Sequence, residues 1–184
     1  MQADHPLLKY REQHKHRLNY MPWLYWTLKP KHRAWAEQWQ NEYQQYLREM
    51  ETVEIGKNCF ISPLAHIFAE RGRKISIGDN TFIAADCTLH GPLQIGNEVA
   101  INHHCILDGG RAGIKLHDQV RIAAYSHLYA FDHGMDLERP IYQQAVTSKG
   151  IEIGQDVWLG AHVGIKDGVK IGHHAVVGMN SMVT

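Results

Sequence analysis

From Ile55 onward the chain places an aliphatic residue at every sixth position, with a small or apolar residue four places later. Two examples are IGDNTF at residues 77–82 and IGNEVA at 95–100. A period of six does not fit an α-helix, whose apolar stripe recurs every 3.6 residues. It fits short parallel strands joined by tight corners, with three such hexads making one turn of a solenoid. The pattern therefore predicts an all-β solenoid over residues 53–184.

The second to fourth places of the hexads hold residues that favour tight corners, such as Gly78-Asp79-Asn80 and Gly96-Asn97. Glycine, asparagine and aspartate adopt positive φ more readily than other residues. We therefore expect these glycines, as well as the Asn and Asp residues, to supply the positive φ angles of the corners.

The three cysteines, Cys59, Cys87 and Cys105, all occupy the fifth place of a hexad. Cys87 and Cys105 are 18 residues apart, which is one full turn, so we expect them to stack about 5 Å apart. Small buried side chains are the expected role, because free cysteine behaves as a small apolar residue and disulfides are rare in the cytoplasm.

Residues 1–52 lack hexads and predict a helical segment that caps the solenoid. Large apolar side chains recur there at i, i+4 spacing, at Trp35, Trp39, Tyr43 and Leu47. This spacing predicts an amphipathic helix from Arg33 to about Glu51. A cap would cover the open end of the first turn. Contact with a membrane surface or a partner is the alternative, since Trp and Tyr beside Lys and Arg also suit an interface.

The hexads stop at LYAFDHGMDLERPIYQQAVTSKG, residues 128–150, and resume at Ile151. A solenoid presents flat walls, so a chemical site needs an element that leaves the wall. The interruption predicts one extruded loop, residues 129–150, that overhangs a groove.

Composition narrows the function classes only a little. The 184 residues include 19 basic and 19 acidic side chains, so the bulk charge does not point to nucleic acid. No apolar run approaches the roughly 18 residues of a membrane span, and the polar N-terminus is not typical of a signal peptide. We therefore expect a cytoplasmic protein. The 14 histidines leave metal binding and proton chemistry to be judged position by position.

The repeat resembles the left-handed parallel β-helix of the hexapeptide-repeat acyltransferases, over residues 53–184. That resemblance implies a homotrimer with its sites between chains and acetyl-CoA as the acyl donor. The same fold also serves γ-class carbonic anhydrases and nucleotidyltransferase tails, so the residues of the site must decide the function.

The segment FDHGMDLERPIYQQ resembles the catalytic loop of the sugar O-acetyltransferase branch of that family. By this resemblance His133 is the general base, and an imidazole can take a hydroxyl proton near neutral pH. Asp132 is a candidate for orienting the His133 ring or contacting the substrate. Arg139 is a candidate for binding the substrate or for anchoring the loop on an acid.

Two residues in AINHHCILDGG are candidates for binding the acceptor. Asn102 matches an asparagine that hydrogen-bonds the acceptor sugar in the family, and a structural turn asparagine is the alternative. Asp108 is a candidate for contacting the acceptor or for a turn residue alone. The resemblance implies a saccharide hydroxyl as the acceptor, and an amine stays open because a histidine base serves both.

The C-terminal run from Ile153 to Thr184 resembles the family most closely. Trp158 matches a tryptophan beside the catalytic histidine and the pantetheine arm. Gly160 and Ala161 match the turn where main-chain amides meet the thioester, so the Ala161 N–H is the candidate oxyanion donor. A second turn of the pantetheine channel is matched by Gly178 and Met179, and two lysines are candidates for the phosphates of the cofactor, Lys166 and Lys170.

Two other classes of function remain open as alternatives. A zinc hydrolyase of the carbonic anhydrase kind needs three imidazoles, two of them typically five residues apart, and no pair of histidines in the hexads has that spacing. His103-His104 and His173-His174 fall at corner positions where solvated polar residues are usual, so we expect no metal. A non-catalytic trimeric scaffold is the other alternative, which the joint presence of His133, Asn102 and Trp158 disfavours.

Overall fold

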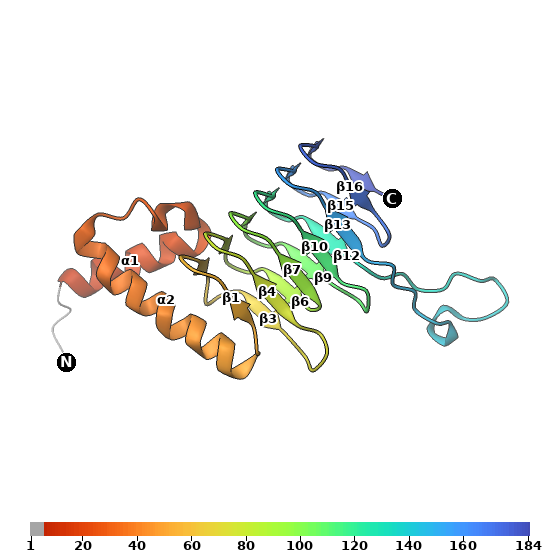
Figure 1. The fold of residues 1–184 in the computed structure, drawn as a ribbon, viewed down its shortest axis with the longest axis horizontal. Coiled ribbons are helices and arrows are strands. Elements are labelled where there is room, and N and C mark those ends of the chain that lie inside the picture. Colours follow the sequence, from red (N-terminus) through yellow and green to blue (C-terminus); the bar gives the residue numbers. More distant parts are fainter. Residues whose placement is uncertain (1–5) are drawn as a thin grey trace.

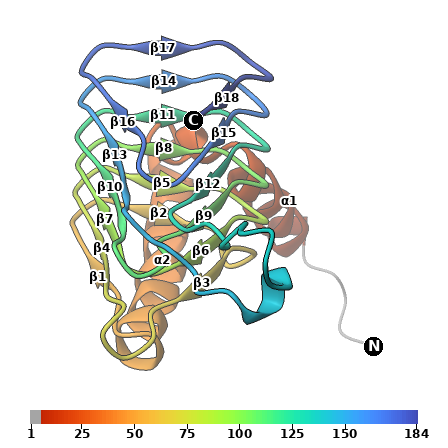
Figure 2. The same ribbon diagram turned by 90° about the vertical axis from the view of Figure 1, so that its right-hand side faces the viewer.

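A computed structural model describes residues 6–184 and shows a β-solenoid preceded by helices (Figures 1 and 2). Within this range, each of six turns contributes three short strands, and the strands align in three six-stranded parallel sheets. The predicted solenoid is confirmed. Residues 1–5 of the predicted cap lie outside the described residues.

The elements follow the chain in a regular order. The helices are α1 (Pro6–Tyr20), the 3-10 helix η1 (Pro22–Tyr25), α2 (Pro30–Met50) and, within the loop, the 3-10 helix η2 (Ile141–Gln143). Sheet A contains β1 (Glu54–Ile55), β4 (Ile75–Ile77), β7 (Leu93–Ile95), β10 (Ile114–Leu116), β13 (Ile151–Ile153) and β16 (Lys170–Ile171). Sheet B contains β2 (Phe60–Ile61), β5 (Phe82–Ile83), β8 (Ala100–Ile101), β11 (Arg121–Ile122), β14 (Trp158–Leu159) and β17 (Val176–Val177). Sheet C contains β3 (His66–Phe68), β6 (Thr88–His90), β9 (Ile106–Asp108), β12 (His127–Tyr129), β15 (Gly164–Ile165) and β18 (Met182–Val183).

The strands of one turn meet at three corners, which we call AB, BC and CA after the sheets that they join. Departures from the hexad register are confined to the CA corner, where residues 69–74, 109–113 and 130–150 leave the wall. The last of these is the predicted loop. The connections from sheet A to sheet B and from sheet B to sheet C have no insertions, so the AB and BC corners stack in unbroken columns.

The corners differ in one respect from the prediction. Positive φ falls on the fourth place of the hexads, for example at Asn80 (φ 54°) and Glu98 (φ 56°), and not on Gly78 or Gly96. Those glycines serve close stacking instead, because a Cβ on Gly78 would lie 2.6 Å from the carbonyl carbon of Gly96 in the next turn. The expectation was right for Asn80 and wrong for the second-place glycines and for the third-place residues Asp79 and Asn97.

Small side chains in the fifth place bind carbonyl groups of the following turn. The buried Thr81 hydroxyl donates to the Gly96 carbonyl oxygen at 2.9 Å and accepts the Val99 N–H at 3.0 Å. The Ser126 hydroxyl donates to the Gly160 carbonyl oxygen at 3.0 Å. All three cysteines are buried free thiols in this same place, as predicted.

The helix predicted from Arg33 begins at Pro30 instead, since proline fits the first turn of a helix. It lies over the first turn of the solenoid, where two buried glutamines bind the outer edge of β2. Gln40 accepts the Ile61 N–H at 2.8 Å and donates to the Ile61 carbonyl oxygen at 3.1 Å. Gln44 donates to the Cys59 carbonyl oxygen at 2.9 Å. The helix thus replaces the missing neighbouring strand. No helix of the described range has the length and apolar character that a bilayer crossing requires.

The Thr81 hydroxyl connects two successive turns, so Thr81→Val should destabilise the solenoid by about 1–3 kcal/mol, because it leaves a buried N–H and a carbonyl unpaired at constant shape. Urea unfolding of the two proteins measures this difference. Thr81→Ser is the matched control, since it retains both hydrogen bonds. A Val variant that is at least as stable as the Ser variant would contradict this account.

Candidate functional site

The candidate residues are divided between two corners of the solenoid. The BC corner holds Asn102, Gly160, Ala161, Gly178 and Met179, and the neighbouring face of sheet B holds Trp158. The CA corner holds Asp108 at the end of β9 and the loop residues Asp132, His133 and Arg139. These corners lie at opposite ends of the sheet C strands. Within one chain, therefore, the candidate base and the candidate oxyanion donor belong to different corners.

The BC corner presents a row of main-chain amides without partners. The main-chain amide in the third place of the hexad donates no hydrogen bond within residues 6–184 in four successive turns, at His103, Ala124, Ala161 and Met179. The amides on either side of Ala161 are engaged, Gly160 with the Val177 carbonyl at 2.9 Å and His162 with the Ala124 carbonyl at 3.1 Å. The Ala161 N–H is therefore available to a ligand.

The AB corner shows what closes such amides elsewhere. There, the side chain in the third place of a hexad accepts a hydrogen bond from the third-place N–H of the hexad one turn earlier. Asp79 accepts the Lys57 N–H at 2.7 Å, and Asn97 accepts the Asp79 N–H at 2.8 Å. Ala124 and Ala161 carry no such acceptor, so the amides of the BC corner remain open at roughly the 4.8 Å spacing of neighbouring strands.

The N-terminal segment limits this row at its lower end. The carbonyl oxygen of Asn19 accepts the Ala85 N–H at 2.7 Å, and the Tyr20 hydroxyl donates to the Asp86 carboxylate at 2.8 Å. The end of α1 thus closes the BC corner in the second turn. The row of open amides begins one turn later, beside Asn102.

An aromatic stack accompanies the row. The rings of His104 and Tyr125 stack at 4.7 Å, and those of Tyr125 and His162 at 4.9 Å and nearly parallel. His103 is half-buried beside them, and burial, with a smaller effect of His104, lowers the pKa of His103. His103 and His104 are partly exposed and also take part in this stack, whereas His173 and His174 are exposed as predicted. The fourth-place aromatic residues were not recognised in the sequence, although their hexad register places them in one column.

Asn102 borders a groove of about 470 Å³ on the face of sheet B. The outward side chains of this sheet run from Phe82 to Ala100 to Arg121 in successive turns, so the small Ala100 leaves a hollow between two larger neighbours. Trp23, which is 47% exposed, lines its other wall. The Asn102 Nδ2 donates to the Ile122 carbonyl oxygen at 2.9 Å, so the side-chain amide is held in place.

Trp158 continues the outward column of the same sheet. It pairs in register with Arg121 and is 54% exposed. The groove, Trp158 and the open amides of the BC corner therefore form one continuous region of the surface.

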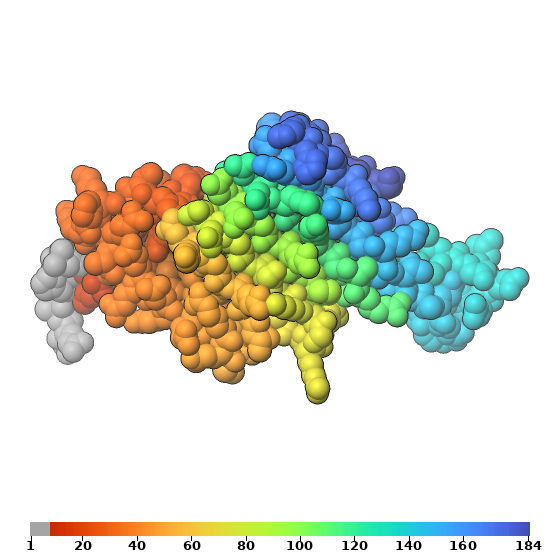
Figure 3. Space-filling model, viewed as in Figure 1, coloured from red at the N-terminus to blue at the C-terminus, as the bar shows by residue number. Residues whose placement is uncertain are grey.

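The loop at the CA corner leaves the wall through a narrow base. Asp132 and Thr147 exchange two main-chain hydrogen bonds of 2.9 Å, which hold the outgoing and returning segments of the loop together. The Ser148 hydroxyl donates to the Ala130 carbonyl oxygen at 2.5 Å and accepts the Arg111 and Ala112 amides. Beyond this base the loop projects from the solenoid, at the end of the molecule opposite the N-terminal helices (Figures 1 and 3).

The loop carries its candidate residues in the open. His133 is exposed, with the Phe131 ring 6.2 Å from its own. The Asp132 carboxylate pairs with Lys166 at 3.3 Å, and no hydrogen bond from it to His133 exists among the described residues. Of the two roles considered for Asp132, orienting the His133 ring is therefore not seen within the single chain, and contacting the substrate stays a prediction. Arg139 forms no salt bridge within residues 6–184, so the expected anchor on an acid is not made there.

Asp108 is part of a charged network beneath the loop. It lies 3.6 Å from Arg73 and 3.3 Å from the His90 ring, and it accepts the Gly110 N–H at 3.0 Å. The same residues line a cavity of about 320 Å³ with Phe131. Asp108 therefore lies near the base of the loop and on a different corner from Asn102, although only six positions separate them.

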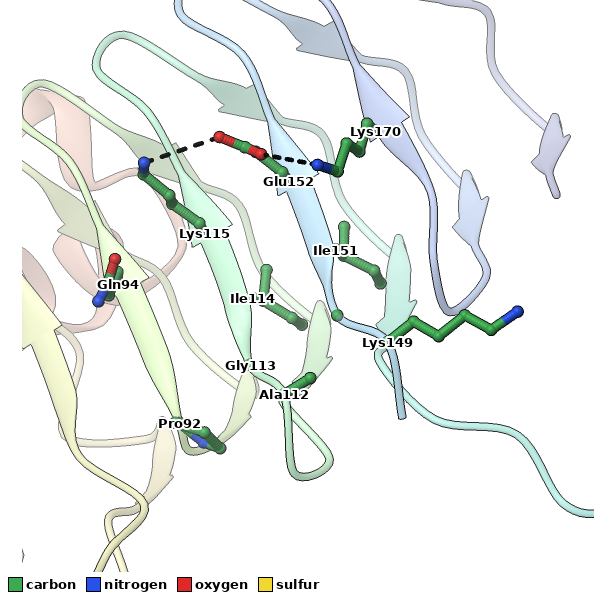
Figure 4. A pocket seen from close by; sticks show the side chains of 11 residues that line it. Pro92, Gln94, Ala112, Gly113, Ile114, Lys115, Lys149, Ile151, Glu152 and Lys170 are labelled. Atoms are coloured by element: carbon green, nitrogen blue, oxygen red, sulfur yellow. Dashed lines mark ion pairs between the residues drawn. The ribbon is translucent and has the colours of Figure 1, made fainter. Parts of the chain in front are cut away.

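Lys170 lies in a shallow cavity of about 300 Å³ on sheet A, shown in Figure 4. Glu152 lies 3.7 Å from Lys170 and 3.7 Å from Lys115. A hydrogen bond with His117 at 2.9 Å, together with the two lysines, lowers the pKa of Glu152. Both lysines proposed for the cofactor phosphates, Lys166 and Lys170, are thus paired with acids of their own chain. Among the described residues, no three His, Cys, Asp or Glu side chains converge as a metal site would require.

Comparison with known proteins relates this chain to acyl-group transferases. The family model "Bacterial transferase hexapeptide (six repeats)" matches residues 150–184. A variant of AntD, an N-acyltransferase from Bacillus cereus solved with dTDP and coenzyme A, superposes with a TM-score of 0.67. It is 32% identical in sequence, over 77% of this chain and 78% of the other.

Two curated relatives carry related activities. The dTDP-4-amino-4,6-dideoxy-D-glucose acyltransferase of Escherichia coli is 30% identical over 118 residues, which are 59% of this chain and 62% of that protein. Galactoside O-acetyltransferase of Lactococcus lactis is 29% identical over 79% of this chain and 60% of that protein. The similarity thus spans less than two thirds of the length of either relative.

Proposed function

Because this chain belongs to the hexapeptide-repeat acyltransferase family, we propose that it transfers an acyl group, by preference acetyl, from acyl-coenzyme A to a saccharide acceptor. The observation that carries the proposal is the row of open amides at the BC corner, next to Trp158 and Asn102. Coenzyme A in the AntD structure supports an acyl-CoA donor. The relatives include both an O-acetyltransferase and an N-acyltransferase. We favour a hydroxyl acceptor because of the loop motif around His133.

The chemistry is direct transfer within a ternary complex. The His133 imidazole takes the proton of the acceptor hydroxyl as its oxygen attacks the thioester carbonyl carbon. The Ala161 N–H stabilises the negative charge that develops on the carbonyl oxygen. Collapse of the tetrahedral intermediate re-forms the carbonyl and breaks the carbon–sulfur bond. The coenzyme A sulfur leaves with the proton that His133 returns.

A complete site would require two chains. The loop bearing His133 starts from the CA corner, whereas the open amides lie at the BC corner of the same chain. The loop tip exposes several large apolar side chains, namely Met135, Leu137, Ile141 and Tyr142. Exposed apolar groups of this kind gain free energy when a partner covers them. We therefore propose a homotrimer in which the loop of one chain reaches the BC corner of its neighbour.

The groove on sheet B is where we place the acceptor. Asn102 joins it to the open amides, so a sugar in the groove would present a hydroxyl to the thioester. Trp23 offers an exposed aromatic face, and Arg121 and Asn80 supply polar groups along its walls. A mostly apolar surface with a few fixed polar groups is typical of small-molecule sites.

His133→Ala should lower kcat about 10²- to 10⁴-fold, because the general base is lost. Coenzyme A thiol release from acetyl-CoA, measured across a panel of sugars and amino sugars, tests this. His174→Ala is the control, as this exposed histidine lies at the AB corner. A loss below about tenfold for His133→Ala would remove the residue from the role of base.

Ala161→Pro should retain the fold and lower kcat about 10²-fold or more, since it removes only the N–H of the proposed oxyanion donor. Proline is compatible with this place because His162, which follows Ala161, has φ 57°, and the residue before a positive-φ turn residue is commonly proline. Ala161→Gly retains the amide and is the matched control. Equal losses in the two variants would contradict a role for the N–H.

Trp23→Ala should raise the KM for the saccharide acceptor several-fold, by about 1 kcal/mol of lost stacking, and leave the KM for acetyl-CoA unchanged. Steady-state kinetics with each substrate varied in turn separate the two constants. Tyr46→Ala, which truncates another exposed aromatic residue of the N-terminal segment, is the control. An increase confined to the KM for acetyl-CoA would place the acceptor elsewhere.

A further inference from the structure

Another cavity, of about 560 Å³, lies between α1 and α2 and takes no part in the proposed acyl transfer. Its lining consists of cationic, imidazole and aromatic side chains, contributed by Tyr10, Arg11 and His14 of α1 and by Lys31, His32 and Trp35 of α2. Among these lining residues none is acidic. The chain as a whole has equal numbers of acidic and basic residues, so the positive charge is a local feature.

The two cations that line the cavity differ from two others on the same helices. Lys15 and Arg33, on the same two helices, pair with Glu12 at 3.0 Å and Glu37 at 2.8 Å. Arg11 and Lys31 pair with no acid within residues 6–184, and the Arg11 guanidinium lies 5.7 Å from the centre of the Trp35 ring. Lys15 and Arg33 are thus neutralised by acids of their own helices, whereas the two cations in the cavity are not.

The start of α2 adds to the concentration of positive charge. Its first turn contains no acidic residue and includes Lys31 and His32, although the N-terminus of a helix favours negative charge. The rings of His14 and His32 approach to 4.6 Å. Burial, followed by the charges of His32, Arg17 and Lys31, lowers the pKa of His14. An anion in the cavity would relieve each of these unfavourable contacts.

We propose that this cavity binds a phosphate-bearing organic ligand, with Arg11 and Lys31 holding the phosphate and Tyr10 and Trp35 contacting the remainder. Guanidinium and ammonium groups are the side chains best suited to phosphate oxygens. The volume falls within the range of small-molecule sites, about 300–1,000 Å³, and exceeds what one phosphate fills. A soluble organic phosphate and a lipid headgroup share this chemistry.

Two pairs of substitutions with equal loss of charge test the site. Arg11→Gln with Lys31→Gln removes the unpaired cations of the cavity, and Lys15→Gln with Arg33→Gln removes the paired cations outside it. Inorganic pyrophosphate, measured by titration calorimetry, should bind the first variant at least about tenfold more weakly than wild type, and the second nearly as well as wild type. Equal weakening of the two variants would mean a general charge effect and overturn the proposal.

Vesicles of phosphatidylcholine with or without phosphatidylglycerol distinguish the two sources of phosphate. Binding of wild type to the anionic vesicles, lost in the Arg11/Lys31 variant, assigns a lipid headgroup, and binding of pyrophosphate alone assigns a soluble ligand. Binding to neither probe overturns the proposal. No part of this test depends on acyl transfer, so it stands apart from the function of the BC corner.

The His14 imidazole gives an independent readout. Nearby phosphate favours the charged imidazolium, so saturating pyrophosphate should raise the pKa of His14 from its lowered value, as followed by NMR titration. The groups facing His14 are Arg17 on its own helix and Lys31 and His32 on α2. A pKa of His14 that does not move with pyrophosphate would place the anion elsewhere and overturn the assignment.

Discussion

Close stacking of successive turns is the constraint on which the rest of this molecule depends. Each strand has only two or three residues, so the corners hold as much main chain as the sheets, and each buried amide and carbonyl of a corner needs a partner. Fifth-place hydroxyls and thiols bind the carbonyls, and at the AB corner Asp and Asn side chains bind the amides. The BC corner lacks such Asp and Asn side chains. Its amides therefore remain available, and a row of parallel donors arises from the repeat itself rather than from any single residue.

The excursions from the hexad register gather at one corner of the described residues. The AB and BC corners stack as unbroken columns of hexads, which an insertion there would interrupt, whereas the CA corner departs from the register in several turns. The loop of residues 130–150, the charged network around Asp108 and the shorter excursions therefore share that corner. Ser148 and the Asp132–Thr147 pair fix the base of the loop, while its apolar tip remains uncovered.

Periodicity made the fold predictable, because an aliphatic residue at every sixth position leaves few alternatives to a parallel solenoid. Partners of individual side chains were harder to predict. Asp132 and His133 are adjacent in sequence, yet the carboxylate faces Lys166 of the next turn. Asn102 and Asp108 are near neighbours in sequence but lie on different corners, since one short strand separates them. Stacking between turns decides such contacts, and sequence spacing alone does not reveal which residue of the next turn lies opposite.

The N-terminal segment contacts both the open edge of the solenoid and its candidate site. Gln40 and Gln44 complete the open edge of β2, and Asn19 closes the one amide of the BC corner that would otherwise extend the row downward. Trp23 then forms a wall of the groove that begins where the row ends. A cap that only covered the first turn would need none of these contacts at the BC corner. The segment therefore both terminates the solenoid and sets the boundary of its candidate site, with the groove proposed for the acceptor at the start of the amide row and the later turns left for the proposed donor.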